Sequence, residues 1–139
     1  MSKLFGLQPI GVGTESVESF PSYMYRLSAL HGVSLDRLIR WMQIESESLI
    51  DEGLPKPSTS AAPWSVVAMV RPTASVRDLV ALTGYLTGCT TLRCTTFLAL
   101  ENLHYRSFDL FHKKLRWCPR CWAEDLRRGQ SVYYRLSWT

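Results

Sequence analysis

A helical period in the apolar residues leaves few folds open to this chain. Phe20, Met24, Leu27 and Leu30 recur at intervals of three and four residues, with Tyr23 beside them. This spacing places the side chains on one face of an α-helix. The chain must therefore bury a helix face early in its sequence.

A second helix follows after a short joint. Ser19 is expected to cap the first helix and Gly32 to close it, because these residue types favour those positions. Ser34 can cap the next helix, whose apolar face comprises Leu35, Leu38, Ile39 and Met42. Two short helices joined by Gly-Val-Ser predict a helix hairpin, which with the segment before it occupies residues 1–50.

The middle of the chain predicts another helix pair. Residues 51–74 contain the stretch DEGLPKPSTSAAP and are expected to form a linker or long loop. Ser75 then begins a helix that Gly88 can close, and Thr90 or Thr91 can cap a further helix. Residues 75–104 are therefore expected to have the form of a helix-turn-helix, although that form alone does not establish DNA binding.

Length and composition fit a protein that builds its own core. The chain has 139 residues, 46% of them hydrophobic and 20% charged, which suits one domain or two small subdomains. It contains no apolar run long enough for a membrane helix, and residues 1–13 lack the pattern of a signal peptide. We therefore expect a cytoplasmic protein that has no membrane partner.

The second half of the chain is basic. Residues 70–139 hold 11 Lys and Arg against 5 Asp and Glu, whereas residues 1–69 hold 5 against 7. Basic groups interleave with aromatic ones in YRSFDLFHKKLR, a pattern that can hold nucleic acid by charge and stacking. The candidate contacts are Lys113, Lys114, Arg116 and Arg120. An ordinary solvated basic surface is the alternative.

The motif Trp-Cys-Pro-Arg-Cys-Trp is the strongest local signal for chemistry. Cys118 and Cys121 are spaced so that both sulfurs can reach one zinc ion. Residues 105–139 are therefore expected to form a zinc-ribbon-like knuckle with zinc as its cofactor. Candidates for the remaining ligands are Cys89, Cys94, His104 and His112. A thiol redox site is the alternative, although it lacks the expected βαβ context.

Other motifs of catalysis are absent from the sequence. It contains no nucleophile elbow, phosphate-binding loop or zinc-protease motif. The apolar residues Leu4, Phe5 and Leu7, together with Tyr23, are instead candidates for docking on a partner or on the chain's own core. The sequence predicts a mainly α protein that is not an enzyme.

Two blocks of the sequence resemble the TniQ family. The first is the run from Glu15 to Ser34, in which six positions resemble the family's opening signature: Glu15, Ser16, Ser19, Phe20, Arg26 and Leu27. The second is RWCPRCWAED followed by YYRLSW, which looks like the family's C-P-x-C-x-x-E-D and [YW]-x-R-x-x-W stretch. The order and separation of the blocks also agree with the family.

The resemblance implies a target-selection adaptor in DNA transposition. Such proteins connect a TnsC-type AAA+ ATPase to a target-recognition element, either a CRISPR effector complex or target DNA. In the family the C-P-x-C pair is usually completed by a C-x-x-H motif, whereas this sequence ends at Thr139 before one. We therefore expect an incomplete zinc site in this sequence. Either the sequence is a fragment or a naturally short member of the family, or its zinc uses other ligands.

A small helix-turn-helix transcription regulator with a zinc knuckle is the alternative function. It would bind a defined duplex tightly without an ATPase partner, whereas the adaptor would depend on one.

Overall fold

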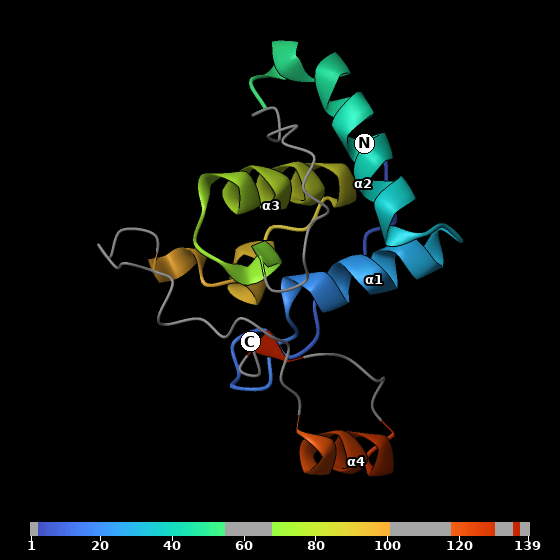
Figure 1. The fold of residues 1–139 in the computed structure, drawn as a ribbon, viewed down its shortest axis with the longest axis vertical. Helices are drawn as coiled ribbons and strands as arrows, with labels where there is room; N and C mark the ends of the chain where they lie inside the picture. The colour runs from blue at the N-terminus through green and yellow to red at the C-terminus, as the bar shows by residue number, and fades with distance from the viewer. Residues whose placement is uncertain (1–2, 55–67, 101–117, 130–134, 137–139) are drawn as a thin grey trace.

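The computed structural model describes residues 3–54, 68–100, 118–129 and 135–136, and these residues are mainly helical (Figure 1). The α-helices are α1 (Phe20–Leu30), α2 (Leu35–Ser48), α3 (Ala74–Thr87) and α4 (Pro119–Arg127). The short 3₁₀ helices are η1 (Ile50–Glu52), η2 (Ala68–Val70), η3 (Leu92–Thr95) and η4 (Leu98–Leu100). Within the described residues, extended pairing is confined to one isolated antiparallel bridge between Glu18 and Arg135. No helix in this part of the chain has the length and apolar character needed to cross a membrane.

The predicted joint between the first two helices is confirmed. Gly32 adopts a left-handed conformation with φ of 64°, and Val33 N–H donates to the Ser28 carbonyl oxygen at 3.1 Å. Ser34 Oγ accepts the Arg37 backbone N–H at 3.4 Å and so caps α2. Ser19 occupies the N-cap position of α1 as expected, but its side chain makes no capping hydrogen bond.

The two N-terminal helices form a corner rather than lying side by side along their lengths. Figure 1 shows α2 leading steeply away from the end of α1, with α3 lying across the space between them. The core fills this space with side chains from all three helices. Its fully enclosed members include Phe20, Tyr23, Met24, Leu27, Met42, Met69, Leu79, Leu82, Leu86 and Leu92.

The prediction of a helix-turn-helix in the middle of the chain is wrong for its second helix. The first helix is present as α3, capped by the Thr73 hydroxyl and closed by Gly88. Residues 92–100 instead form η3 and η4, two short 3₁₀ helices. Thr95 Oγ1 donates to the Leu92 carbonyl oxygen at 2.5 Å, and Thr96 Oγ1 donates to that of Arg93 at 2.9 Å. Such local side-chain bonds compete with the backbone ladder of an α-helix.

The N-terminal segment packs against the end of α3. Leu4 N–H donates to the Leu86 carbonyl oxygen at 2.9 Å, and the Leu4 side chain is buried in the core. Tyr23 is fully enclosed, and its hydroxyl donates to the Leu7 carbonyl oxygen at 2.9 Å. The sequence left open whether these side chains dock on a partner or on the chain's own core. Leu4 and Tyr23 lie in the chain's own core.

Candidate functional site

The two cysteines of the C-P-R-C motif lie at the start of α4. Cys118 is the N-cap residue, and Pro119, with its fixed φ, suits the first turn. Cys118 Sγ accepts the Cys121 backbone N–H at 3.1 Å. Hydrogen bonds from the Cys121 thiol and from this N–H lower the pKa of Cys118, whereas the bond to Cys118 raises the pKa of Cys121. Cys118 is therefore the more acidic thiol of the pair.

The described residues supply only half of a zinc site. A structural zinc ion takes four ligands, and no group of three or more His, Cys, Asp or Glu side chains that could hold a metal occurs among the residues described. All four cysteines are described: Cys89 is buried, Cys94 is exposed, and neither joins the Cys118–Cys121 pair in such a group. His104 and His112 lie outside the described residues. These residues alone do not fit a closed zinc site, and the expected zinc-ribbon knuckle is not seen, because the motif opens a helix instead.

Further along α4, a carboxylate faces an arginine from the end of the described chain. Arg135 Nη2 donates to Asp125 Oδ1 at 2.7 Å and to Oδ2 at 2.8 Å. The side chain of Asp125 is only 3% exposed and that of Arg135 17%. Such a shielded ion pair holds α4 to the segment around Arg135 by charge and hydrogen bonding.

That same segment is tied to the start of α1. Glu18 and Arg135 form the isolated antiparallel bridge, and Leu136 N–H donates to the Val17 carbonyl oxygen at 2.8 Å. In Figure 1 the short red segment at Arg135 lies between α4 and the blue loop before α1. Residues from opposite ends of the sequence therefore meet here.

Glu18 organises the N-terminal side of this junction with a fully buried carboxylate. Its Oε2 accepts Arg26 Nη1 at 2.6 Å and the Ile10 backbone N–H at 3.1 Å, and its Oε1 accepts Ser22 Oγ at 3.0 Å. Burial raises the pKa of Glu18, and this effect outweighs the opposing influence of Arg26. One carboxylate thus joins the loop before α1 to the first two turns of the helix.

The comparison with known families decides what kind of protein this is. A family model described as TniQ matches residues 9–139, nearly the whole chain. The chain belongs to the TniQ family. A search of curated proteins found no match.

Membership in the TniQ family implies a transposition-associated adaptor role without catalysis. The matched range contains both sequence blocks that resemble the family, and the structure brings them together. Glu18 and Arg26 come from the first block, whereas Asp125 and Arg135 come from the second. In this TniQ protein the two blocks therefore share a structural role, which is to join α4 to α1.

Only one of the four residues predicted to contact nucleic acid lies in the described part of the chain. Lys113, Lys114 and Arg116 lie outside the described residues. Arg120 is exposed in the first turn of α4, next to Cys121. Its contact with nucleic acid stays a prediction.

The candidate docking residues of the N-terminal segment divide by burial. Leu4 and Tyr23 belong to the core, and Leu7 is partly buried against it. Phe5 is 59% exposed and lies against the His31 ring, with ring centroids 4.8 Å apart. Phe5 is therefore the member of this set that is open to a partner.

A surface groove that the sequence did not predict lies beside Phe5. We call it the N-terminal groove: it has a volume of about 490 Å³ and is lined by Lys3, Leu4, His31, Val33, Arg37, Leu38, Arg40, Trp41 and Ile44. Trp41 and Ile44 are 37% and 69% exposed on the outer side of α2. Trp41 and Ile44 are three residues apart and lie outside the buried face of α2. This second apolar stripe was the sequence signal for the groove.

Proposed function

We propose that this TniQ protein is a non-enzymatic adaptor in bacterial DNA transposition, acting in the cytoplasm. It links a TnsC-type AAA+ ATPase to a target-recognition element, which is a CRISPR effector complex or target DNA. The match of the TniQ family model over residues 9–139 carries this proposal. The adaptor role of the family requires surfaces for partners rather than a catalytic centre.

The N-terminal groove and Phe5 are the proposed surface for the ATPase. Exposed apolar side chains that cluster on one face are typical of protein interfaces. Trp41 and Ile44 line the groove, and Phe5 lies against His31, another of its lining residues. Aromatic residues such as Phe5 and Trp41 are of the type found in protein interfaces. Lys3, Arg37 and Arg40 also line the groove, and Lys3 is ion-paired with Glu45 and Arg40 with Asp36. The groove therefore offers a partner mixed charge around exposed apolar side chains.

In this proposal the basic C-terminal half lies near nucleic acid. Cys118 and Cys121 supply two zinc ligands, and the remaining ligands come from beyond the described residues. The helix-turn-helix regulator is less well supported, because residues 92–100 form 3₁₀ helices in place of the recognition helix.

A pull-down against the TnsC-type ATPase of the same genetic locus tests the adaptor role. We expect retention that depends on ATP and on duplex DNA, since the partner is the assembled ATPase. Retention should fall at least about tenfold in the Phe5→Ala and Ile44→Glu variants, because hot-spot losses exceed ~2 kcal/mol.

Leu126→Ala is the matched control for these variants. Leu126 is 57% exposed, like Phe5, but lies on α4 and does not line the N-terminal groove. Its substitution should leave retention unchanged. No retention of the unaltered chain, together with tight duplex binding by the chain alone, would overturn the adaptor role in favour of the regulator.

A further inference from the structure

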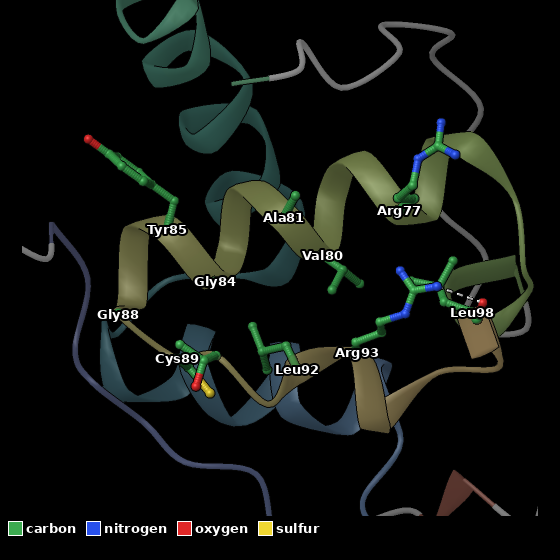
Figure 2. A pocket seen from close by; sticks show the side chains of 11 residues that line it. Arg77, Val80, Ala81, Gly84, Tyr85, Gly88, Cys89, Leu92, Arg93 and Leu98 are labelled. Carbon is green, nitrogen blue, oxygen red and sulfur yellow. Dashed lines mark hydrogen bonds between the residues drawn. The ribbon is translucent and has the colours of Figure 1, made fainter. Parts of the chain in front are cut away.

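The cysteine pair at the start of α4 differs in its surroundings from the other cysteines of the chain. Cys118 and Cys121 are both half-buried, and their thiols form a hydrogen bond with each other. Cys89 follows the end of α3 (Figure 2), is only 4% exposed, and its thiol donates to Gln8 Oε1 at 3.6 Å. Cys94 is exposed on η3. The two thiols at α4 are therefore both in contact with each other and within reach of solvent.

The first turn of α4 holds this pair in a geometry that a disulfide can close. Cys118 is the N-cap residue and Cys121 lies three residues later, so helix geometry places their Cα atoms about 5 Å apart. That separation lies within the span of protein disulfides. Cys118 Sγ accepts the Cys121 backbone N–H at 3.1 Å, which holds this sulfur over the turn that carries the second thiol. The two sulfurs can therefore bond without a large movement of the backbone.

Metal binding is a weak competitor for these thiols in the described part of the chain. A closed zinc site needs four ligands, and the described residues contain no group of three or more side chains that could hold a metal. Two thiolates alone hold zinc weakly, because affinity comes from full coordination. Disulfides in a reducing cytoplasm are typically transient ones that sense or transfer redox state. The pair is thus available for thiol–disulfide exchange.

We propose that Cys118 and Cys121 form a reversible disulfide that locks the first turn of α4. The oxidant is a low-molecular-weight disulfide of the glutathione type. The thiolate of one cysteine attacks a sulfur of this disulfide and releases one small thiolate, and the second cysteine then attacks the mixed disulfide and releases the other. The two small thiolates take up the two protons of the cysteine thiols, so the protein dithiol is oxidised and the small disulfide is reduced. An excess of small thiol reverses both steps.

The disulfide would change α4 in two ways. It closes residues 118–121 into a ring, which restricts fraying of the helix one turn before Asp125. Trp122 N–H donates to the Cys118 carbonyl oxygen at 3.0 Å and Cys121 N–H donates to its sulfur, so these two amides report on that turn. The disulfide also withdraws both sulfurs from metal binding, since the thiolate is the ligand form. This inference does not depend on the adaptor role.

Mass spectrometry of the full chain after equilibration with glutathione tests the proposal. The buffer holds reduced glutathione in about tenfold excess over the oxidised form, and free thiols are alkylated after an acid quench. Trypsin cuts after Arg116, Arg120 and Arg127, so the disulfide joins the peptides 117–120 and 121–127. We expect the joined peptides to exceed the glutathione adduct at Cys94 at least about tenfold, because the second thiol is supplied within the same turn.

Two serine variants are the matched controls. Cys121→Ser keeps Cys118 without a second thiol beside it, so the glutathione adduct at Cys118 should accumulate. Cys94→Ser removes the exposed thiol on η3 and should leave the joined peptides unchanged. In the oxidised wild-type chain, hydrogen-exchange protection of the Cys121 and Trp122 amides should rise about tenfold over the reduced chain, as expected for a short closed loop.

Three outcomes would overturn the proposal. In the first, glutathione adducts at Cys118 or Cys121 outnumber the joined peptides, so the two sulfurs do not reach each other. In the second, both cysteines stay reduced in this buffer, whether or not zinc is bound. In the third, the disulfide forms but the Cys121 and Trp122 amides gain no protection, so it does not lock the turn. None of them bears on retention of the ATPase, so the disulfide and the adaptor role can fail separately.

Discussion

Among single residues, Glu18 has the most unusual surroundings. A carboxylate with no exposed surface is costly unless it is paired and hydrogen-bonded, and Glu18 has Arg26, Ser22 and the Ile10 N–H as partners. Glu15, Ser16 and Arg26 stand out in the sequence as part of the TniQ-like opening pattern, whereas Glu18 does not. Its burial depends on the loop before α1 and on Arg135, and no local pattern predicts contacts of that range.

The buried carboxylate predicts a specific dependence of stability on pH. Because burial raises the pKa of Glu18, the folded chain holds this proton more tightly than the unfolded chain does. The contribution of Glu18 to stability is therefore complete below the unfolded pKa and declines as pH rises through the folded pKa. Urea unfolding from about pH 4 to 7 should show the wild-type chain losing stability relative to Glu18→Gln. A relative gain would mean that the pairing with Arg26 outweighs burial.

Among the elements, the helices with the clearest apolar period were the ones predicted correctly. Most of the buried faces of α1, α2 and α3 follow from local spacing, and Ser34, Gly32 and Gly88 mark ends of these helices as predicted. Three details differ: Leu30 is exposed, Ser19 makes no capping bond, and Thr73 rather than a residue at Ser75 caps α3. The segment after Gly88 has apolar residues at plausible intervals, but its threonine hydroxyls bond to nearby carbonyl oxygens. That competition depends on detailed geometry, which residue spacing alone does not reveal.

The site could be predicted only in part for a similar reason. Cys118 and Cys121 stood out because their spacing is a local motif. The pairing of Asp125 with Arg135, and the meeting of Arg135 with Glu18, depend on contacts between separate segments.

The docking of α4 should depend on Asp125 far more than on its neighbour Glu124. Asp125→Ala leaves Arg135 without its carboxylate, which should cost about 3 kcal/mol, as for other shielded pairs that lose one partner. Glu124 pairs with Arg128 on the exposed side of α4, so Glu124→Ala should cost under about 0.5 kcal/mol. Hydrogen exchange of the α4 amides measures both changes. Equal protection in the two variants would show that the Asp125 pair does not hold the helix.

For the whole molecule, the proposed surface for the ATPase and the attachment of α4 are separate. The N-terminal groove is built from the N-terminal segment, the α1–α2 joint and α2, whereas α4 is attached through Asp125, Arg135 and the residues before α1. Substitutions in the groove should therefore leave the docking of α4 unchanged.

The bridge between Glu18 and Arg135 also bears on the order of events during synthesis on the ribosome. The core between α1, α2 and α3 can assemble once the chain has emerged through η4, before Arg135 has left the ribosome. Until Arg135 emerges, Asp125 on α4 lacks its ion-pair partner, and Glu18 lacks the residue with which it forms the antiparallel bridge. The nascent chain would thus hold a formed N-terminal body with an undocked C-terminal helix, and docking would be its last folding step.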